Sequence, residues 1–142
     1  MSQQEINAKS FKKFKGLLDN LYLDTSDVAK KVVTKQANTG LRVTKKNTPV
    51  GVYKYKQGGT LRKGWKRNPT VKIDNEYMAS YFNNIEYGLY VNNGHRVVNK
   101  SGETVGYVQG VRMLEQGINE AKRQTRRIFN EEIDNAKKKG GW

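Results

Sequence analysis

The 142-residue chain has room for one hydrophobic core and little more. It carries 27 Lys and Arg against 13 Asp and Glu, a formal net charge of +14, and its 10% aromatic content is too high for a disordered chain. The absence of cysteine excludes disulfide scaffolds, iron–sulfur clusters, cysteine-based zinc sites and thiol catalysis. No apolar run approaches the roughly 18–20 residues that a membrane helix needs.

The N-terminal part predicts two basic helices. In residues 4–22 and again in residues 26–45, apolar side chains recur every three or four positions, and Thr25 or Ser26 suits the N-cap of the second helix. Gly40 lowers helix propensity by about 1 kcal/mol relative to Ala, so we expect the second helix to be marginal beyond Gly40 unless it is packed. The two apolar stripes consist of Phe11, Phe14, Leu18 and Leu21, and of Val28, Val32, Val33, Ala37 and Leu41.

Positive charge is concentrated in the same half of the chain. Lys and Arg outnumber Asp and Glu by 17 to 4 in residues 1–72, but only by 10 to 9 in residues 73–142. This asymmetry favours an anionic partner for the first half. The alternative is a solvated face on which lysines maintain solubility, because net charge by itself defines no function.

The middle of the chain predicts a loop followed by short strands. Residues 48–59 form a flexible basic loop of a length that is usually functional or disordered. Asp74-Asn75 has turn chemistry, Asn99-Lys100-Ser101-Gly102 predicts a hairpin turn, and residues 85–91 fit one helical turn or two. The expected strands are 60–66, 71–73, 77–82, 97–98 and 104–108.

Residues 111–138 predict a long C-terminal helix, with Gly140 as its stop. Its expected apolar face holds Leu114, Ile118, Ala121, Thr125, Ile128 and Ile133, and its expected solvated surface includes Glu131, Glu132 and Asp134. The element order predicts an α+β fold, an antiparallel β-sheet packed by the long C-terminal helix and the N-terminal helices. We expect a single domain over residues 1–142, made of a helical basic part (1–47), the flexible loop (48–59) and a β-sheet core with the C-terminal helix (60–142).

Residue types for catalysis and metal binding are scarce. His95 is the only histidine, and the nearest acids, Asp74, Glu76 and Glu86, have no recognised metal-ligand spacing. The sequence contains no G-x-S-x-G motif, and Gly58-Gly59-Thr60 lacks the consensus of a phosphate-binding loop. We therefore expect no catalytic residues, no metal, no cofactor and no small-molecule substrate, and we predict that the protein is not an enzyme.

Cations and aromatic residues interleave over residues 54–67. Because cations pair with phosphates and aromatic rings stack on bases, this pattern supports an alternative function, in which the basic half, residues 1–72, binds nucleic acid. No helix-turn-helix, zinc finger or other recognised nucleic-acid-binding motif accompanies it. Trp65 follows Leu61 at strand spacing, which favours burial in the core over stacking on bases.

Three segments resemble a known family. Gly59-Thr60-Leu61-Arg62-Lys63-Gly64-Trp65 is similar to a G-x-L-R-x-S/G-W/I motif, residues 84–96 to N-x-x-x-Y-A-x-Y-V-E-x-G-H-R, and residues 106–114 to V-x-G-R-x-M-L. The family consists of the small tail-component or tail-completion proteins at the head–tail junction, or neck, of long-tailed bacteriophages of the siphovirus type. The segments follow the family's order within residues 48–120. Gly88 replaces the family's Ala, Asn92 replaces its acid, and Val111 splits its Gly-Arg pair.

The resemblance implies a structural virion protein of the neck, made in the bacterial host cytoplasm. It implies a ring, a homohexamer, between the head connector and the tail tube. Its partners would be other copies of itself, connector or stopper proteins, and tail-terminator or tail-tube proteins. Genomic DNA would pass through the lumen, and no membrane would be involved. The basic half would face either this DNA or acidic neighbours.

Two sets of residues are candidates for this role. Tyr87, Tyr90 and Val91, at i, i+3 and i+4, are expected to dock a short helix onto the sheet, and Gly94 is expected to take a positive φ. The expected core consists of Leu61, Trp65, Tyr87, Tyr90 and Leu114. The candidate structural motif residues are Gly59, Leu61, Trp65, Tyr87, Tyr90, Val91, Gly94, His95, Gly110, Met113 and Leu114. The candidate interface or DNA-facing residues are Arg62, Lys63, Lys66, Arg67 and Arg96.

Overall fold

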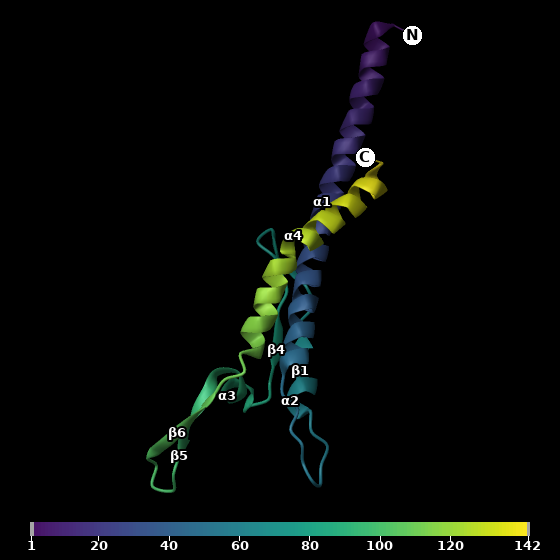
Figure 1. Ribbon diagram of the computed structural model, residues 1–142. Coiled ribbons are helices and arrows are strands. Elements are labelled where there is room, and N and C mark those ends of the chain that lie inside the picture. The colour runs from purple at the N-terminus through teal and green to yellow at the C-terminus, as the bar shows by residue number, and fades with distance from the viewer. Residues whose placement is uncertain (1, 142) are drawn as a thin grey trace.

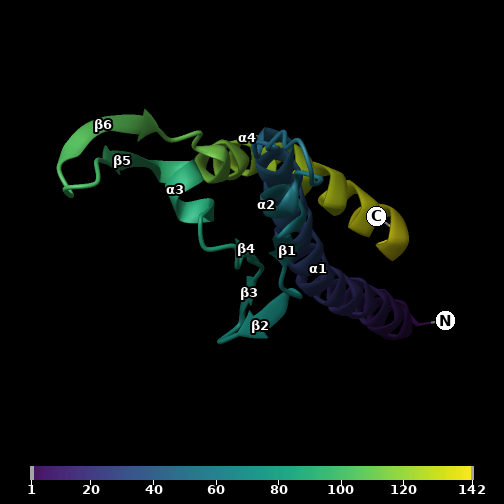
Figure 2. The same cartoon turned by 90° about the horizontal axis from the view of Figure 1, so that it is seen from below.

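Two long antiparallel helices form the body of the molecule, and short strand pairs project from it (Figures 1 and 2). The computed structural model describes residues 2–141, apart from the side chains of residues 20–24. The fold is α+β, as the sequence predicts. In chain order the elements are α1 (Gln3–Asn47), α2 (Thr60–Lys63), β1 (Trp65–Arg67), β2 (Val71–Ile73), β3 (Glu76–Met78), β4 (Tyr81–Asn83), α3 (Gly88–Asn93), β5 (Gly94–Val98), β6 (Thr104–Gln109) and α4 (Met113–Gly140).

Helix α1 is continuous where the sequence predicts two helices. It begins with a capping box, in which Ser2 Oγ accepts from the Glu5 N–H and the Glu5 carboxylate accepts from the Ser2 N–H. Thr25 and Ser26, the expected N-cap, lie inside the helix, and the Ser26 hydroxyl is 3.0 Å from the hydroxyl of Tyr77. The N-cap prediction was wrong because Ser26 bonds a distant side chain instead of starting a new helix.

Helices α1 and α4 approach each other closely at two glycines. A β-carbon on Gly117 would lie 2.5 Å from the Gly40 carbonyl oxygen and would overlap the Thr44 hydroxyl. Thr44 is completely buried and donates to the Tyr81 hydroxyl over 3.2 Å. Gly40, expected to make the helix marginal, therefore permits close packing, and α1 continues to Asn47.

The core consists of two clusters along the helix pair. The first contains Val28 and Val32 of α1 and Ile128 of α4, with Ile133 and Ala136 packed against it. The second contains Leu61, Trp65 and Met113, which come from α2, β1 and the start of α4.

The buried face of α4 is rotated from the predicted one. Glu132, predicted on a solvated surface, is buried and forms an ion pair with Lys35 of α1, while Ile118, predicted on the apolar face, is partly exposed. The prediction was wrong because a carboxylate that is paired across the helix crossing can replace an apolar residue there. The most buried residues of α4 are Met113, Gly117, Ile128 and Glu132.

The strands form three separate antiparallel pairs: β1 with β4, β2 with β3, and β5 with β6. Asp74 and Asn75, both with positive φ, make the predicted turn between β2 and β3. The strand predicted over 60–66 was wrong in its first half, because residues 60–63 form α2. The strand predicted over 77–82 is interrupted at residues 79–80, so β3 and β4 belong to different pairs.

The end of α4 and the position of α3 lie close to the predicted ones. Gly140 is the last residue of α4, and Gly141 rather than Gly140 takes the left-handed conformation that ends it. Residues 88–93 form α3, which begins within the segment predicted as one or two helical turns. Within residues 2–141, no helix combines the length and the apolar character that crossing a membrane requires.

Candidate functional site

The three motif segments meet in the second core cluster. Leu61 and Trp65 of the first segment pack with Met113 of the third, and Val91 of the second lies against them, half-buried. Leu114 is half-buried beside the same cluster. Leu61 lies in α2 and Trp65 begins β1, so the turn at Gly64, and not the predicted strand alternation, brings the two side chains together. The burial of Leu61 and Trp65 agrees with the prediction that they lie in the core.

The ring of Trp65 is tied to the C-terminal end of α1. Its Nε1 donates to Thr48 Oγ1 over 2.9 Å, and this hydroxyl donates to the Thr44 carbonyl over 2.6 Å. Arg62 donates from Nε and Nη2 to the Thr48 carbonyl, at 3.1 and 2.7 Å. The C-terminal carbonyls of a helix carry partial negative charge, so this guanidinium stabilises the end of α1. The buried, hydrogen-bonded indole is not free to stack on a base.

Asn92 connects the second and third motif segments. Its Oδ1 accepts from the Leu114 N–H over 2.9 Å, and its Nδ2 donates to both carboxylate oxygens of Glu115, at 3.1 and 3.0 Å. Arg112, at the N-cap of α4, has left-handed φ and supplies no side-chain cap. Asn92 therefore caps α4 from α3, across a separation of 22 residues. The Asn92 amide supplies the acceptor for the Leu114 N–H and the donors for Glu115. This explains an Asn at a position where the family that this segment resembles has an acid.

Glycines allow the motif backbones to touch. Gly94 has φ 82°, as predicted, and a β-carbon there would lie 2.5 Å from the Val108 carbonyl oxygen. A β-carbon on Gly110 would overlap the Asn92 carbonyl oxygen. A β-carbon on Gly88 would lie 3.0 Å from Leu61 Cδ1, so Gly88 packs closely against Leu61 at a position where the family that this segment resembles has Ala. Gly59 takes a left-handed φ of 98° where the chain enters α2.

Tyr87 and Tyr90 are not core residues. Tyr87 is 46% exposed and Tyr90 58% exposed, so the prediction that they dock α3 onto a sheet was wrong. With Val91 and Val98 they line an open hollow of about 590 Å³, which also includes His95 and Arg96. The His95 ring packs edge-on against Tyr90, with centroids 6.1 Å apart.

The β5–β6 hairpin extends from α3 (Figure 1). Its apolar side chains are exposed. Tyr107, paired with Arg96, is 80% exposed, and Val97, Val105 and Val108 are also exposed. The opposite end of the molecule has a comparable surface, since Phe11, Phe14 and Leu18 of α1 are exposed. The fourth residue of that predicted stripe, Leu21, lies outside the described side chains.

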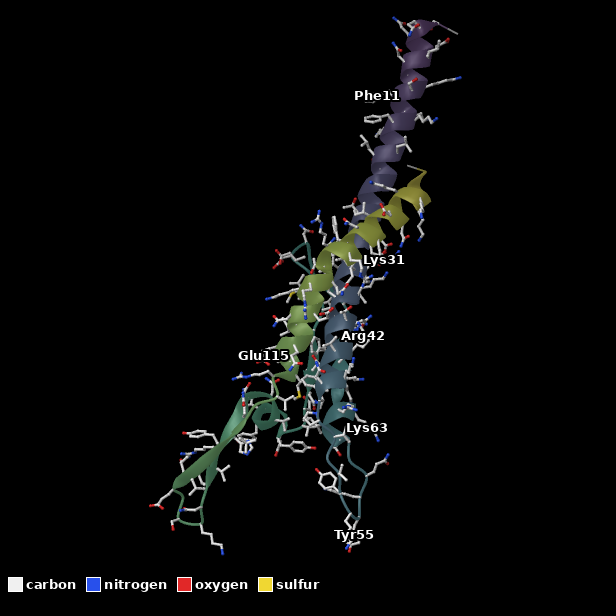
Figure 3. The ribbon with its side chains drawn as sticks, viewed as in Figure 1. Phe11, Lys31, Arg42, Tyr55, Lys63 and Glu115 are labelled. Atoms are coloured by element: carbon white, nitrogen blue, oxygen red, sulfur yellow. The ribbon has the colours of Figure 1, made fainter. Side chains whose placement is uncertain are left out.

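The predicted interface cations differ in their surroundings. Lys63, Lys66 and Arg96 are exposed, Arg62 is bound to the end of α1, and Arg67 donates to the Asn68 carbonyl and the Thr70 hydroxyl. In the loop after α1, cations lie over aromatic rings: Lys54 over Tyr55, at the loop tip in Figure 3, and Lys56 over Tyr53. That these cations face DNA or a neighbouring subunit stays a prediction.

Four residues essential to this arrangement escaped the sequence analysis as site residues: Thr44, Thr48, Asn92 and Gly117. Each acts through a partner far along the chain, so no local pattern identifies it. Only Asn92 gave a signal in the sequence, because it stands at a motif position where the family that this segment resembles carries an acid. Within residues 2–141, no group of three or more His, Asp or Glu side chains could hold a metal ion.

Comparison with known proteins gives one match. The model of a family described as "Bacteriophage HK97-gp10, putative tail-component" matches residues 12–94. This range covers most of α1, the first motif segment and most of the second. No significant match to a curated protein or to a solved structure was found.

Proposed function

This chain belongs to the HK97-gp10-like family of bacteriophage tail components, and we propose that it joins head to tail as one subunit of a neck ring. As a tail component it is a structural protein of the virion and contacts other virion proteins. The proposed ring contains six copies and lies between the head connector or stopper and the tail terminator or tail tube. The copy number follows from the resemblance of the three motif segments.

The observation that carries this proposal is the amount of apolar surface that the chain leaves uncovered. An isolated two-stranded hairpin is at best marginally stable in water, yet β5–β6 exposes Tyr107, Val105 and Val108 to solvent. The neighbouring α3 exposes Tyr87 and Tyr90. Large exposed apolar patches mark protein interaction sites. A subunit that is packed between neighbours would cover this surface, whereas a free monomer would not.

The position of these surfaces favours a ring. The N-terminal end of α1 and the β5–β6 hairpin lie at opposite ends of the molecule (Figure 1). A subunit with two different interaction surfaces associates head to tail, and such an association closes into a ring when the rotation between copies permits it. Both surfaces would then be used in every copy.

The alternative function, in which residues 1–72 bind nucleic acid, is less well supported. Its strongest aromatic candidate, Trp65, is buried and bonded to Thr48. Tyr53 and Tyr55 remain exposed beside lysines. A positive lumen that surrounds passing DNA needs only cations on phosphates, without base stacking. The net charge of +14 is therefore compatible with the neck proposal.

Electron microscopy of particles made without this gene tests the proposal. We expect DNA-filled heads and separate tails, or tails with faulty ends, and we expect a plasmid copy of the gene to restore joined particles. Normal virions in the absence of the gene would refute the role in joining. Salt-dependent DNA binding by the purified chain together with normal virions would favour the alternative.

A further inference from the structure

The N-terminal part of α1, residues 3–19, forms an arm that extends beyond the end of α4 (Figures 1 and 3). The last turns of α4 lie beside α1 at Asp27, which shares a hollow with Lys138 and Lys139. On the arm, Phe11 is 70% exposed and Phe14 is 54% exposed. The arm is thus a helix that no other described part of the chain covers.

The arm has a defined apolar face. Phe11, Phe14 and Leu18 follow at spacings of three and four, and Ile6 and Leu17 widen the same side of the helix. Val28 and Val32 continue this spacing, and there the face is covered by Ile128 of α4. The lysines of the arm lie outside this face: Lys9, Lys12, Lys13 and Lys15. The apolar face of the arm therefore continues the face of α1 that α4 covers at Val28 and Val32.

The helix pair offers a matching groove. An open hollow of about 460 Å³ lies between α1, α4 and residues 79–81. Its apolar lining includes Val33 and Ala37 of α1 and Leu114, Ile118 and Ala121 of α4. Phe129 lies on the same side of α4 as Ile118, because eleven residues make about three helical turns, and it is exposed. The α4 lining of this hollow, from Leu114 to Lys122, is about 12 Å long at 1.5 Å per residue. With Phe129 included, the apolar side of α4 is about 22 Å long, and the arm is about 25 Å long.

We propose that the arm of one copy lies in the α1–α4 groove of the next copy. The arm cannot fill the groove of its own chain, since it continues α1 away from it (Figure 1). A second copy supplies a helix of the right length and an apolar face. Two phenylalanines can bury about 150–250 Å² each, a large share of the roughly 800 Å² that each partner contributes to a standard interface.

Electrostatics favours this contact over arm-to-arm pairing. Two arms paired through their apolar faces would bring together Lys13 and Lys15 of both copies, which flank that face, and like charges side by side on helices are destabilising. The hollow is lined by one cation, Lys122, and otherwise by uncharged residues. The contact is heterologous, because arm and groove are different surfaces. It rests on the proposed ring and names one contact between its subunits, in addition to the surface of the β5–β6 hairpin.

Crosslinking can test this contact directly, because the chain has no cysteine of its own. Ser10 lies near the middle of the arm between Ile6 and Phe14 on the apolar face. Lys122 lines the hollow and lies near the middle of the side of α4 that runs from Leu114 to Phe129. This pair of midpoints is close whichever way the arm runs. The variants Ser10→Cys and Lys122→Cys are mixed at high concentration and treated with a short bismaleimide. The matched control is Lys12→Cys, on the opposite side of the arm, mixed with Lys122→Cys.

We expect a crosslinked heterodimer from the first mixture and its loss in the control mixture. Crosslinked dimers from Ser10→Cys alone, or equal yields from both mixtures, would overturn the proposal. Light scattering of the unmodified chain distinguishes failure of the arm contact from failure of the proposed ring. Self-association without the expected crosslink refutes the arm contact alone. A chain that stays monomeric, and whose deletion leaves virions normal, refutes the ring as well.

A second pair of variants addresses the same contact without cysteine. Phe11→Asp with Phe14→Asp places two charges on the arm, outside both core clusters, so we expect the helical circular dichroism to be retained and self-association to be lost. The control, Lys9→Asp with Lys12→Asp, also introduces two aspartates, but outside the apolar face, and it lowers the net charge by four instead of two. Equal loss in both double variants would overturn the proposal.

Discussion

Replacement of Gly117 by alanine tests the helix crossing on which the whole arrangement depends. In an exposed helix this change is favourable, since Gly costs about 1 kcal/mol relative to Ala. Here a β-carbon would overlap the Thr44 hydroxyl and lie 2.5 Å from the Gly40 carbonyl oxygen. The hydroxyl can rotate, but the carbonyl belongs to the backbone of α1. The two helices must therefore move apart.

The expected cost follows from these contacts. Overpacking of a close-packed site costs about 1–3 kcal/mol. Displacement of Thr44 also weakens its hydrogen bond to Tyr81, which contributes about 1 kcal/mol. After the gain of about 1 kcal/mol in helix propensity, we expect Gly117→Ala to lower the free energy of unfolding by about 1–3 kcal/mol.

Urea denaturation followed by circular dichroism measures this free energy. Gly16→Ala is the matched control, because a β-carbon on Gly16 meets nothing within 4 Å. It should leave stability unchanged or increase it by up to about 1 kcal/mol. The same substitution is thus expected to have opposite signs at two positions. Gly117→Ala as stable as the unmodified chain would refute the close crossing.

Three further measurements probe the motif region. Trp65→Ala should lower the free energy of unfolding in urea by about 3–5 kcal/mol, because the indole is buried; a loss near zero would remove Trp65 from the core. Asn92→Ala should cost about 1–3 kcal/mol in the same assay, because it leaves the Leu114 N–H without its acceptor; an unchanged midpoint would argue against capping from α3. Burial raises the pKa of Tyr81, so the unfolded chain loses this proton first and stability should fall as the pH rises above about 10. The fall should be shallower in Tyr81→Phe, and equal slopes of melting temperature against pH would contradict this assignment.

Local chemistry predicted the hairpin turns and the long C-terminal helix. Asp74 and Asn75 adopt positive φ and Gly102 ends the second hairpin turn, because turn residues act within a few positions of the chain. The long C-terminal helix and the α+β class followed from apolar spacing alone. The motif segments also predicted that Leu61, Trp65 and Met113 have structural roles, and the structure brings these three side chains together.

Distant partners explain the errors. Ser26 resembles an N-cap, yet its hydroxyl meets Tyr77, 51 residues away. Glu132 has the polarity of a surface residue, yet Lys35 of α1 pairs with it. Asn92 caps a helix that begins 21 positions later, at Met113. The two members of each pair lie too far apart in the chain for a local sequence pattern to connect them. Their roles are therefore visible only in the folded structure.

The wrong prediction that Tyr87 and Tyr90 are buried has a different cause. Tyr87 and Tyr90 have the spacing of residues that dock a helix, and this spacing predicts burial. In the single chain they remain exposed, next to the uncovered β5–β6 hairpin. Sequence patterns do not distinguish a face covered within the chain from one covered by a neighbour. In the proposed ring, both tyrosines would be covered by adjacent subunits.

A cryo-electron microscopy reconstruction of the neck in intact virions tests the central claim most directly. We expect copies of this chain in a closed ring between the head connector and the tail tube. The arm of each copy should lie against the α1–α4 groove of the next copy. A virion in which this chain lies outside the neck, or forms no closed ring there, would contradict the proposed function.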